Sequence, residues 1–431
     1  MWSALPTEMK LAVVGILDSG DIKSLSQVDQ NTYTACLPSA FKSVKLGNSA
    51  VLQSFVDNVP RSYCRYIHQL DISIDHNASR SVTDLLIAIL AAAPCLEEFV
   101  LHCTGSALHP KIIPCFGQLD RLERLSLHNN GPDELRPLSE RLVVSIAASV
   151  PNLKHLSLDR VSRSFMHAPD LRGVFPYVPL VTGDDDIPDH SFLGADLYLP
   201  SLLRISTLTE LFIRDTHLGD PRWATVPVSC KLQVVDLGSC YHENEAFNSV
   251  CIQRIMGAVG KTVDEFSLTT AVSDAAFAKP SVTPLQRLRK LHISPFFPVD
   301  SVVDTMSNLA GSPIESLSMQ CYEDDVVDVC AALEDFLSVR VERGAGFYEK
   351  LARIDVSVTE NEGSGPLDSD EDAECKQATK RLQELCRDLR LSTTISKAIS
   401  PVAASRLARS TGLVPSRWAV PTDGRSRSMT L

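Results

Sequence analysis

A short apolar pattern recurs along most of this chain. Apolar residues occupy the first, fourth and sixth positions of ten six-residue motifs, which begin at Ile67, Leu96, Leu122, Leu153, Leu208, Leu232, Val263, Leu288, Ile314 and Leu351. Seven of the nine steps between these starts are 24 to 31 residues long, and the steps after Leu153 and Ile314 are 55 and 37 residues. The last two apolar positions alternate, as they do on a strand with one buried face.

Helical patterns lie between the motifs. Apolar residues with i, i+3, i+4 spacing form stripes within 82–90, 138–146 and 302–310. Strands that alternate with helices about every 26 residues require parallel strands joined by right-handed crossovers. The sequence therefore predicts an α/β fold, a curved solenoid with parallel strands on its concave face and helices on its convex face.

The repeated motif resembles that of leucine-rich-repeat proteins over roughly residues 60–358. The family usually places Asn or Cys three positions after the last apolar residue, and only Asn130 and Cys240 do so here. The alternative is an ordinary α/β domain whose buried strands share a pattern. The 55-residue step after Leu153 contains five prolines and the sequence "GDDD", so we expect an irregular insertion at about 165–200 or a divergent repeat within it.

The chain begins with two short amphipathic patterns. Met9, Val13 and Leu17 have four-residue spacing after Pro6, and Ile22, Leu25 and Val28 follow a polar turn. Such helices could cap the first repeat, since a solenoid needs its end covered. They could also be a docking site for another protein.

This segment resembles the F-box, the module of about 40 residues that binds a Skp-type adaptor in SCF-type ubiquitin ligases. The matching positions are Leu5, Pro6, Glu8, Met9, Val13, Leu17, Asp18, Asp21, Ile22, Leu25 and Val28, and "LPSAFKSVKL" from Leu37 resembles the closing segment. Gln30 and Asn31 stand where the family often has basic residues. The resemblance implies adaptor binding by Leu5, Pro6, Met9, Val13, Leu17, Ile22, Leu25 and Val28.

Composition limits the classes of partner. The net charge of −12 argues against a nucleic acid or an anionic membrane as the main partner. The longest apolar run, residues 85–93, is about half of what a bilayer span needs. No secretory signal is evident at the N-terminus, and the 12 cysteines contain no C-x-x-C pair. We expect a cytoplasmic or nuclear protein with reduced thiols.

No motif for catalysis stands out. The segment "IMGAVGKT" at 255–262 lacks the first glycine of a phosphate-binding loop and precedes a strand, so a helix-to-strand turn with Gly260 at the helix end is expected. The histidines show no metal-ligand spacing, and there is no nucleophile-elbow motif. The sequence predicts a protein that is not an enzyme and has no cofactor or metal.

The predicted organisation divides the chain into several parts. These are an F-box at 1–46, a connector at 47–66, a solenoid at 67–358, an acidic linker at 359–375, a helix at 376–391 and a disordered basic tail at 392–431. The linker is assigned from its run of acidic residues, and the tail from its lack of apolar periodicity.

The resemblances together imply a substrate-recognition subunit of a cullin–RING (SCF-type) ligase. It would contact a Skp-type adaptor, through it a cullin scaffold, and an unknown protein target. The alternative is a leucine-rich-repeat interaction scaffold whose N-terminal helices only form a cap. Strand alternation places candidate target-binding residues on the concave face, namely Glu210, Phe212, Arg214, Arg289, Lys290 and His292. Phe212 could instead lie beneath the insertion.

Overall fold

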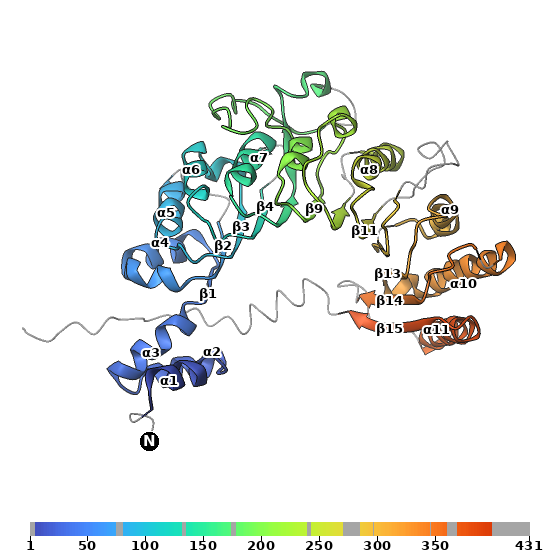
Figure 1. Cartoon of the computed structure of the whole chain (residues 1–431), viewed down its shortest axis with the longest axis horizontal. Coiled ribbons are helices and arrows are strands. Elements are labelled where there is room, and N and C mark those ends of the chain that lie inside the picture. The colour runs from blue at the N-terminus through green and yellow to red at the C-terminus, as the bar shows by residue number, and fades with distance from the viewer. Residues whose placement is uncertain are drawn as a thin grey trace, which may run out of the picture.

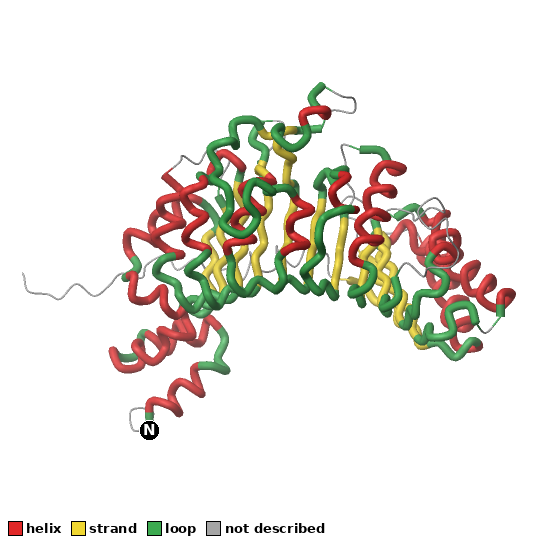
Figure 2. Tube along the Cα trace, turned by 45° about the horizontal axis from the view of Figure 1, so that its top comes forward, coloured by secondary structure: helices red, strands yellow, loops and turns green. Residues whose placement is uncertain are grey.

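The backbone forms an open arc with strands along its inner side and helices along its outer side (Figure 1). The structure, a computed structural model, describes residues 5–74, 81–131, 135–173, 178–238, 243–269, 285–295, 297–344, 346–359 and 369–398. Three N-terminal helices extend from one end of the arc, namely α1 (Thr7–Val14), α2 (Ser19–Ser26) and α3 (Gln30–Ala40) (Figure 2).

Twelve strands form one parallel sheet in the order β1-β2-β3-β4-β6-β9-β10-β11-β12-β13-β14-β15. Each of the ten sequence motifs contributes one of these strands, so the predicted α/β solenoid is confirmed. The insertion adds no strand to this sheet, because β6 pairs directly with β9. The strands are β1 (Ser43–Leu46), β2 (Gln69–Ser73), β3 (Glu98–Cys103), β4 (Arg124–Asn129), β6 (His155–Asp159), β9 (Glu210–Arg214), β10 (Val234–Leu237), β11 (Glu265–Leu268), β12 (Lys290–Ile293), β13 (Ser316–Tyr322), β14 (Arg353–Thr359) and β15 (Ser392–Ala398).

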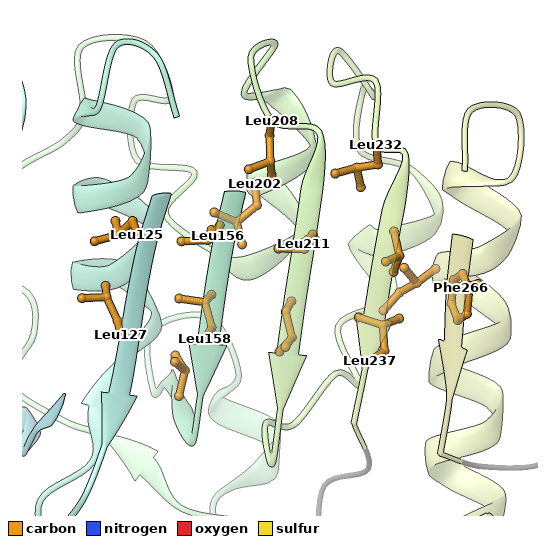
Figure 3. Packing of buried hydrophobic residues seen from close by; sticks show 14 of the residues in the cluster. Leu125, Leu127, Leu156, Leu158, Leu202, Leu208, Leu211, Leu232, Leu237 and Phe266 are labelled. Atoms are coloured by element: carbon orange, nitrogen blue, oxygen red, sulfur yellow. The ribbon is translucent and has the colours of Figure 1, made fainter. Parts of the chain in front are cut away.

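Equivalent apolar residues of successive motifs stack in layers. Leu125, Leu156 and Leu211 are register partners across β4, β6 and β9, and all three are fully buried. Leu127 and Leu158 repeat the arrangement two residues further along each strand (Figure 3). Because side chains alternate between the faces of a strand, the residues between these leucines point to the concave side. The sheet therefore has one buried face and one open face.

The convex side carries one helical segment in most repeats. The α-helices there are α4 (Ser49–Asn58), α5 (Ser81–Leu90), α6 (Ile113–Phe116), α7 (Glu140–Ser149), α8 (Glu245–Val259), α9 (Val302–Asn308), α10 (Val326–Arg343) and α11 (Ser369–Asp388). Before β9 and β10 the crossover contains a short 3-10 helix instead, η6 (Leu199–Arg204) or η7 (Pro221–Ala224). Pro200 and Pro221 fit the first turns of these helices, where an N–H would have no partner. Gly260 caps α8, as expected for that turn.

The predicted irregular insertion lies between β6 and β9 and contacts α7 on the convex side. A second, three-stranded parallel sheet pairs two strands of this segment, β7 (Val161–Ser164) and β8 (Leu180–Val181), with β5 (Leu138–Ser139), which precedes α7. Residues 174–177 of the insertion lie outside the described part of the chain.

A buried network of charged groups holds the insertion against α7. Glu140 accepts hydrogen bonds from the backbone N–H of Ser164 at 2.9 Å and of Leu199 at 3.3 Å. Arg141 donates to the carbonyl oxygens of Asp184 and Ile187 at 3.2 and 3.1 Å. Glu140 and Arg141 are at most 4% exposed. These charges satisfy backbone groups that the irregular chain would otherwise leave unpaired.

The N-terminal helices α1 (Thr7–Val14), α2 (Ser19–Ser26) and α3 (Gln30–Ala40) form a small module with its own core. Asp18 and Asp29 cap α2 and α3 by accepting from the N–H groups of Asp21 and Thr32, each at 2.8 Å. Val14, Ile22 and Cys36 form the module's core, and they make a cluster separate from the solenoid core.

Three of the predicted domain boundaries need correction. β1 already pairs with β2, so the solenoid starts at Ser43 and the 47–66 connector is its first convex segment. α11 begins at Ser369, inside the predicted acidic linker. Residues 392–398 were predicted to be disordered, but they form β15, which pairs along its whole length with β14. Residues 399–431 lie outside the described part of the chain.

Candidate protein-interaction surfaces

The N-terminal module exposes large apolar side chains on α1, in the turn after α1 and just after α2. Met9 is 53% exposed, Leu11 39%, Ile16 85% and Val28 66%, and we call these four residues the N-terminal apolar patch. α1 has apolar residues on several sides, but only Val14 of this helix is buried. The module therefore presents apolar surface that neither its own core nor the solenoid covers.

The predicted adaptor-binding residues differ in how far their side chains are buried. Pro6, Met9 and Val28 are exposed, and Leu5, Val13, Leu17 and Leu25 are half-buried, the last two against the module core. Ile22 is only 7% exposed and belongs to that core, so its assignment to the docking surface is wrong. The sequence prediction did not include the exposed residues Leu11 and Ile16, because they lie off the four-residue stripe of Met9, Val13 and Leu17.

Aromatic rings join the module to the first convex segment. The ring of Phe41, which caps α3, lies 5.4 Å from the ring of Tyr63 and 6.5 Å from that of Phe55, measured between centroids. Burial and a hydrogen bond with Tyr63 raise the pKa of Tyr33 to about 12. α3 thus contacts the solenoid directly, whereas α1 and α2 pack mainly on α3.

The open face of the sheet carries charged pairs that bridge neighbouring strands. Lys290 Nζ lies 3.2 Å from Glu265 Oε2, and His292 Nε2 lies 2.8 Å from Glu265 Oε1. Lys290 and His292 alternate with buried Leu291 and Ile293, so both face the concave side as predicted. Arg289 comes just before β12 at the edge of the sheet, with Nε 3.9 Å from Glu315. These exposed pairs each contribute little to stability.

Phe212 lies on the open face, next to β6. Its ring centroid is 4.7 Å from that of His155, and His155 Nδ1 is 2.8 Å from Glu210 Oε2. The insertion is on the convex side, so the alternative that Phe212 lies beneath it is wrong. Arg214, two residues further along β9, donates to Asp236 Oδ2 at 2.7 Å. Glu210, Phe212 and Arg214 therefore share the concave side, as predicted.

A stacked pair of histidines on β3 and β4 was not predicted. The rings of His102 and His128 are 4.5 Å apart with an interplanar angle of 17°. Burial, and then the neighbouring His128, lower the pKa of His102. The sequence does contain a signal for this pair, because each histidine directly follows the last apolar residue of its motif and the two therefore occupy equivalent positions.

Within the described residues, no group of three or more His, Cys, Asp or Glu is arranged to hold a metal ion. Cys103 points into the core, away from the adjacent His102, and burial raises the pKa of its thiol to about 12. In the same part of the chain, no helix is long and apolar enough to cross a bilayer.

Comparisons with known proteins assign no family to this chain. No family model matches the chain, and no curated protein matches it. A chain of the yeast Rad7–Elc1 complex is similar over 85% of this chain and 92% of its own length, with 14% identity and a TM-score of 0.35. The leucine-rich repeat-containing protein LegL7 from Legionella pneumophila is similar over 72% of this chain and 96% of its own, with 10% identity and a TM-score of 0.30. The fold assignment rests on the strand register described above.

Proposed function

We propose that this protein is a substrate-recognition subunit of an SCF-type ubiquitin ligase. Its N-terminal module would bind a Skp-type adaptor and through it a cullin scaffold. The concave face would bind the target and bring it near the ubiquitin-loaded enzyme, with no chemistry of its own.

The observation that carries this proposal is the exposure of the N-terminal apolar patch. A module that only capped the first repeat would bury its apolar side chains against that repeat. Instead, Met9 and Ile16 are more than half exposed, and Val14 and Ile22 form a core separate from the solenoid. Exposed apolar surface of this kind supports a docking role, and the F-box resemblance of the N-terminal segment suggests the partner.

The alternative, a scaffold whose N-terminal helices cap the solenoid, has one observation in its favour. Phe41 contacts Tyr63 and Phe55, so α3 does cover part of the first convex segment. This contact explains why α3 packs against the solenoid, but it does not explain why the apolar residues of α1 are exposed.

Adaptor capture tests the proposal. The full chain carrying Met9→Asp and Ile16→Asp should lose co-purification with a Skp-type adaptor, because a carboxylate in an apolar interface is costly to desolvate. Both residues are exposed, so the melting temperature should stay close to that of the wild type. Val341→Asp is a matched control, since Val341 is a 60% exposed apolar residue on α10.

The outcomes separate the two functions. Loss of adaptor binding in the double variant alone supports the ligase role. A wild-type chain that captures no adaptor, or a double variant that captures it fully, contradicts that role. A large fall in melting temperature in the double variant would favour the capping role.

A further inference from the structure

The surroundings of Phe212 contain more negative than positive charge. Phe212 is the register partner of Ser157 on β6 and of Asp236 on β10. Glu210 and Arg214 are two residues away on the same face of β9, and Asp159 is the register partner of Arg214. One guanidinium thus lies near three carboxylates around the ring. Histidines lie beside two of these carboxylates, His128 beside Asp159 and His155 beside Glu210, and the group carries a net charge of −2 when both histidines are neutral.

Two of these carboxylates are accessible to a partner. The side chain of Glu210 is 43% exposed and that of Asp159 is 32% exposed. The guanidinium of Arg214 is already paired with Asp236, whose side chain is only 10% exposed. Arg160 and Asp215, which follow the two strands, add one charge of each sign. An incoming anion would therefore meet net repulsion, whereas a cation would meet two accessible acceptors.

The ring itself favours a cation. Phe212 is half-buried between neighbouring strands, and its contact with His155 holds it on the open face. The face of an aromatic ring carries negative charge density and attracts ammonium and guanidinium groups within about 6 Å. Aromatic residues are also enriched among the residues that contribute most to interfaces.

We infer that Phe212, with Asp159 and Glu210, binds a lysine or arginine side chain presented by the protein target. This inference rests on the proposed function only in assuming that the concave face binds a polypeptide. It adds the chemistry of the recognised residue, a cation placed over Phe212 and paired with Glu210 or Asp159.

A peptide selection on the intact protein tests this inference. The probe is a phage-displayed library of random twelve-residue peptides, selected against the full wild-type chain. We expect enriched peptides to contain lysine or arginine, and replacing that residue by glutamine in a synthetic copy should weaken binding at least tenfold. Enrichment of acidic or wholly apolar peptides, or no enrichment at all, would overturn the inference.

Variants of the protein locate the site. Glu210→Gln keeps the shape of the side chain and removes its charge, and Phe212→Leu keeps an apolar side chain and removes the ring. Each should weaken binding of the selected peptide about tenfold. Glu342→Gln, on an exposed position of α10, is the matched control and should leave binding unchanged. Equal binding of the peptide by wild type and Phe212→Leu would exclude a role of the Phe212 ring in binding.

The same proteins separate this inference from the ligase proposal. Phe212→Leu and Glu210→Gln should still capture the Skp-type adaptor. Met9→Asp with Ile16→Asp should still bind the selected peptide. If the wild type captures no adaptor but selects cationic peptides at Phe212, the ligase proposal fails and this inference stands.

Discussion

Arg163 donates a hydrogen bond from Nη2 to Asp220 Oδ2 at 2.8 Å, across 57 residues of sequence. Both side chains are at most 5% exposed. Arg222 also binds Asp220, with Nη2 2.8 Å from the same oxygen. This carboxylate therefore joins β7 to η7 and helps to fix the crossover that replaces a convex α-helix.

Removing this charge should destabilise the protein strongly. We expect Asp220→Asn to lower the free energy of unfolding by about 3–5 kcal/mol, because it removes the nearer counter-ion of the buried Arg163 and leaves only Glu140, whose Oε1 lies 3.9 Å from Arg163 Nε. Urea unfolding measures this effect. Asp196→Asn is the control, since Asp196 pairs with Arg204 but is 53% exposed, and it should cost less than about 1 kcal/mol. Equal effects of the two substitutions would contradict the role of Asp220.

The contribution of Asp220 should depend on pH with a definite sign. Burial alone would raise its pKa, but hydrogen bonds from Arg222 and the charge of Arg163 outweigh burial and hold the pKa below its ordinary value of 3.8. A depressed carboxyl pKa stabilises the fold above the pKa of the unfolded chain, and this stability is lost as the pH falls towards the folded value. The difference in unfolding free energy between wild type and Asp220→Asn should be constant from pH 7 to about 5 and narrow below about 4. A difference that widens on acidification would contradict this sign.

The pKa of His102 should depend on the histidine stacked against it. We expect NMR titration to place the midpoint of His102 below its ordinary value of 6.5, because burial and the neighbouring His128 disfavour its charged form. His128→Gln should move that midpoint upward by removing one of the causes that lower the pKa of His102. His190, whose pKa is lowered by burial alone, is the control and should not change.

The terminal helix and strand should be part of the cooperative fold. Ala378, Leu382 and Cys386 of α11 are fully buried against the solenoid. A chain ending at 368 should therefore be much less stable than a chain ending at 398. Leu382→Ala in the longer chain should cost about 2–5 kcal/mol in the free energy of unfolding, measured with urea. Equal stability of the two truncated chains would show that α11 and β15 do not support the sheet.

The joint between module and solenoid should control local opening of the N-terminal helices. Phe41 is 6% exposed and contacts two aromatic rings. We expect Phe41→Ala to lower the free energy of opening in α1–α3 by about 3 kcal/mol and leave β9–β12 protected, as measured by hydrogen exchange. Phe192→Ala, at a 56% exposed position, should leave both regions unchanged. A uniform loss of protection along the chain would mean that the module is not a separate unit.

The sequence by itself determined the repeating part of the molecule. All ten apolar motifs are strands of one sheet, because burying alternate residues at a fixed period permits only a stacked, parallel arrangement. It also placed Phe212, Lys290 and His292 on the open face, since strand alternation is a local rule. The helices over 81–90 and 140–149 followed from their apolar stripes in the same way.

Other features were decided only by tertiary structure. β15 has the polar sequence of an edge strand, and its order comes from pairing with β14 rather than from an apolar pattern of its own. Ile22 and Ile16 are similar aliphatic residues of one segment, yet one is buried and the other is 85% exposed, because α3 covers a single side of the helices. The ion network around Asp220 joins residues up to 57 positions apart in an irregular segment. Periodicity describes how one element meets its neighbours, whereas burial of charges and edges depends on which distant segments the fold brings together.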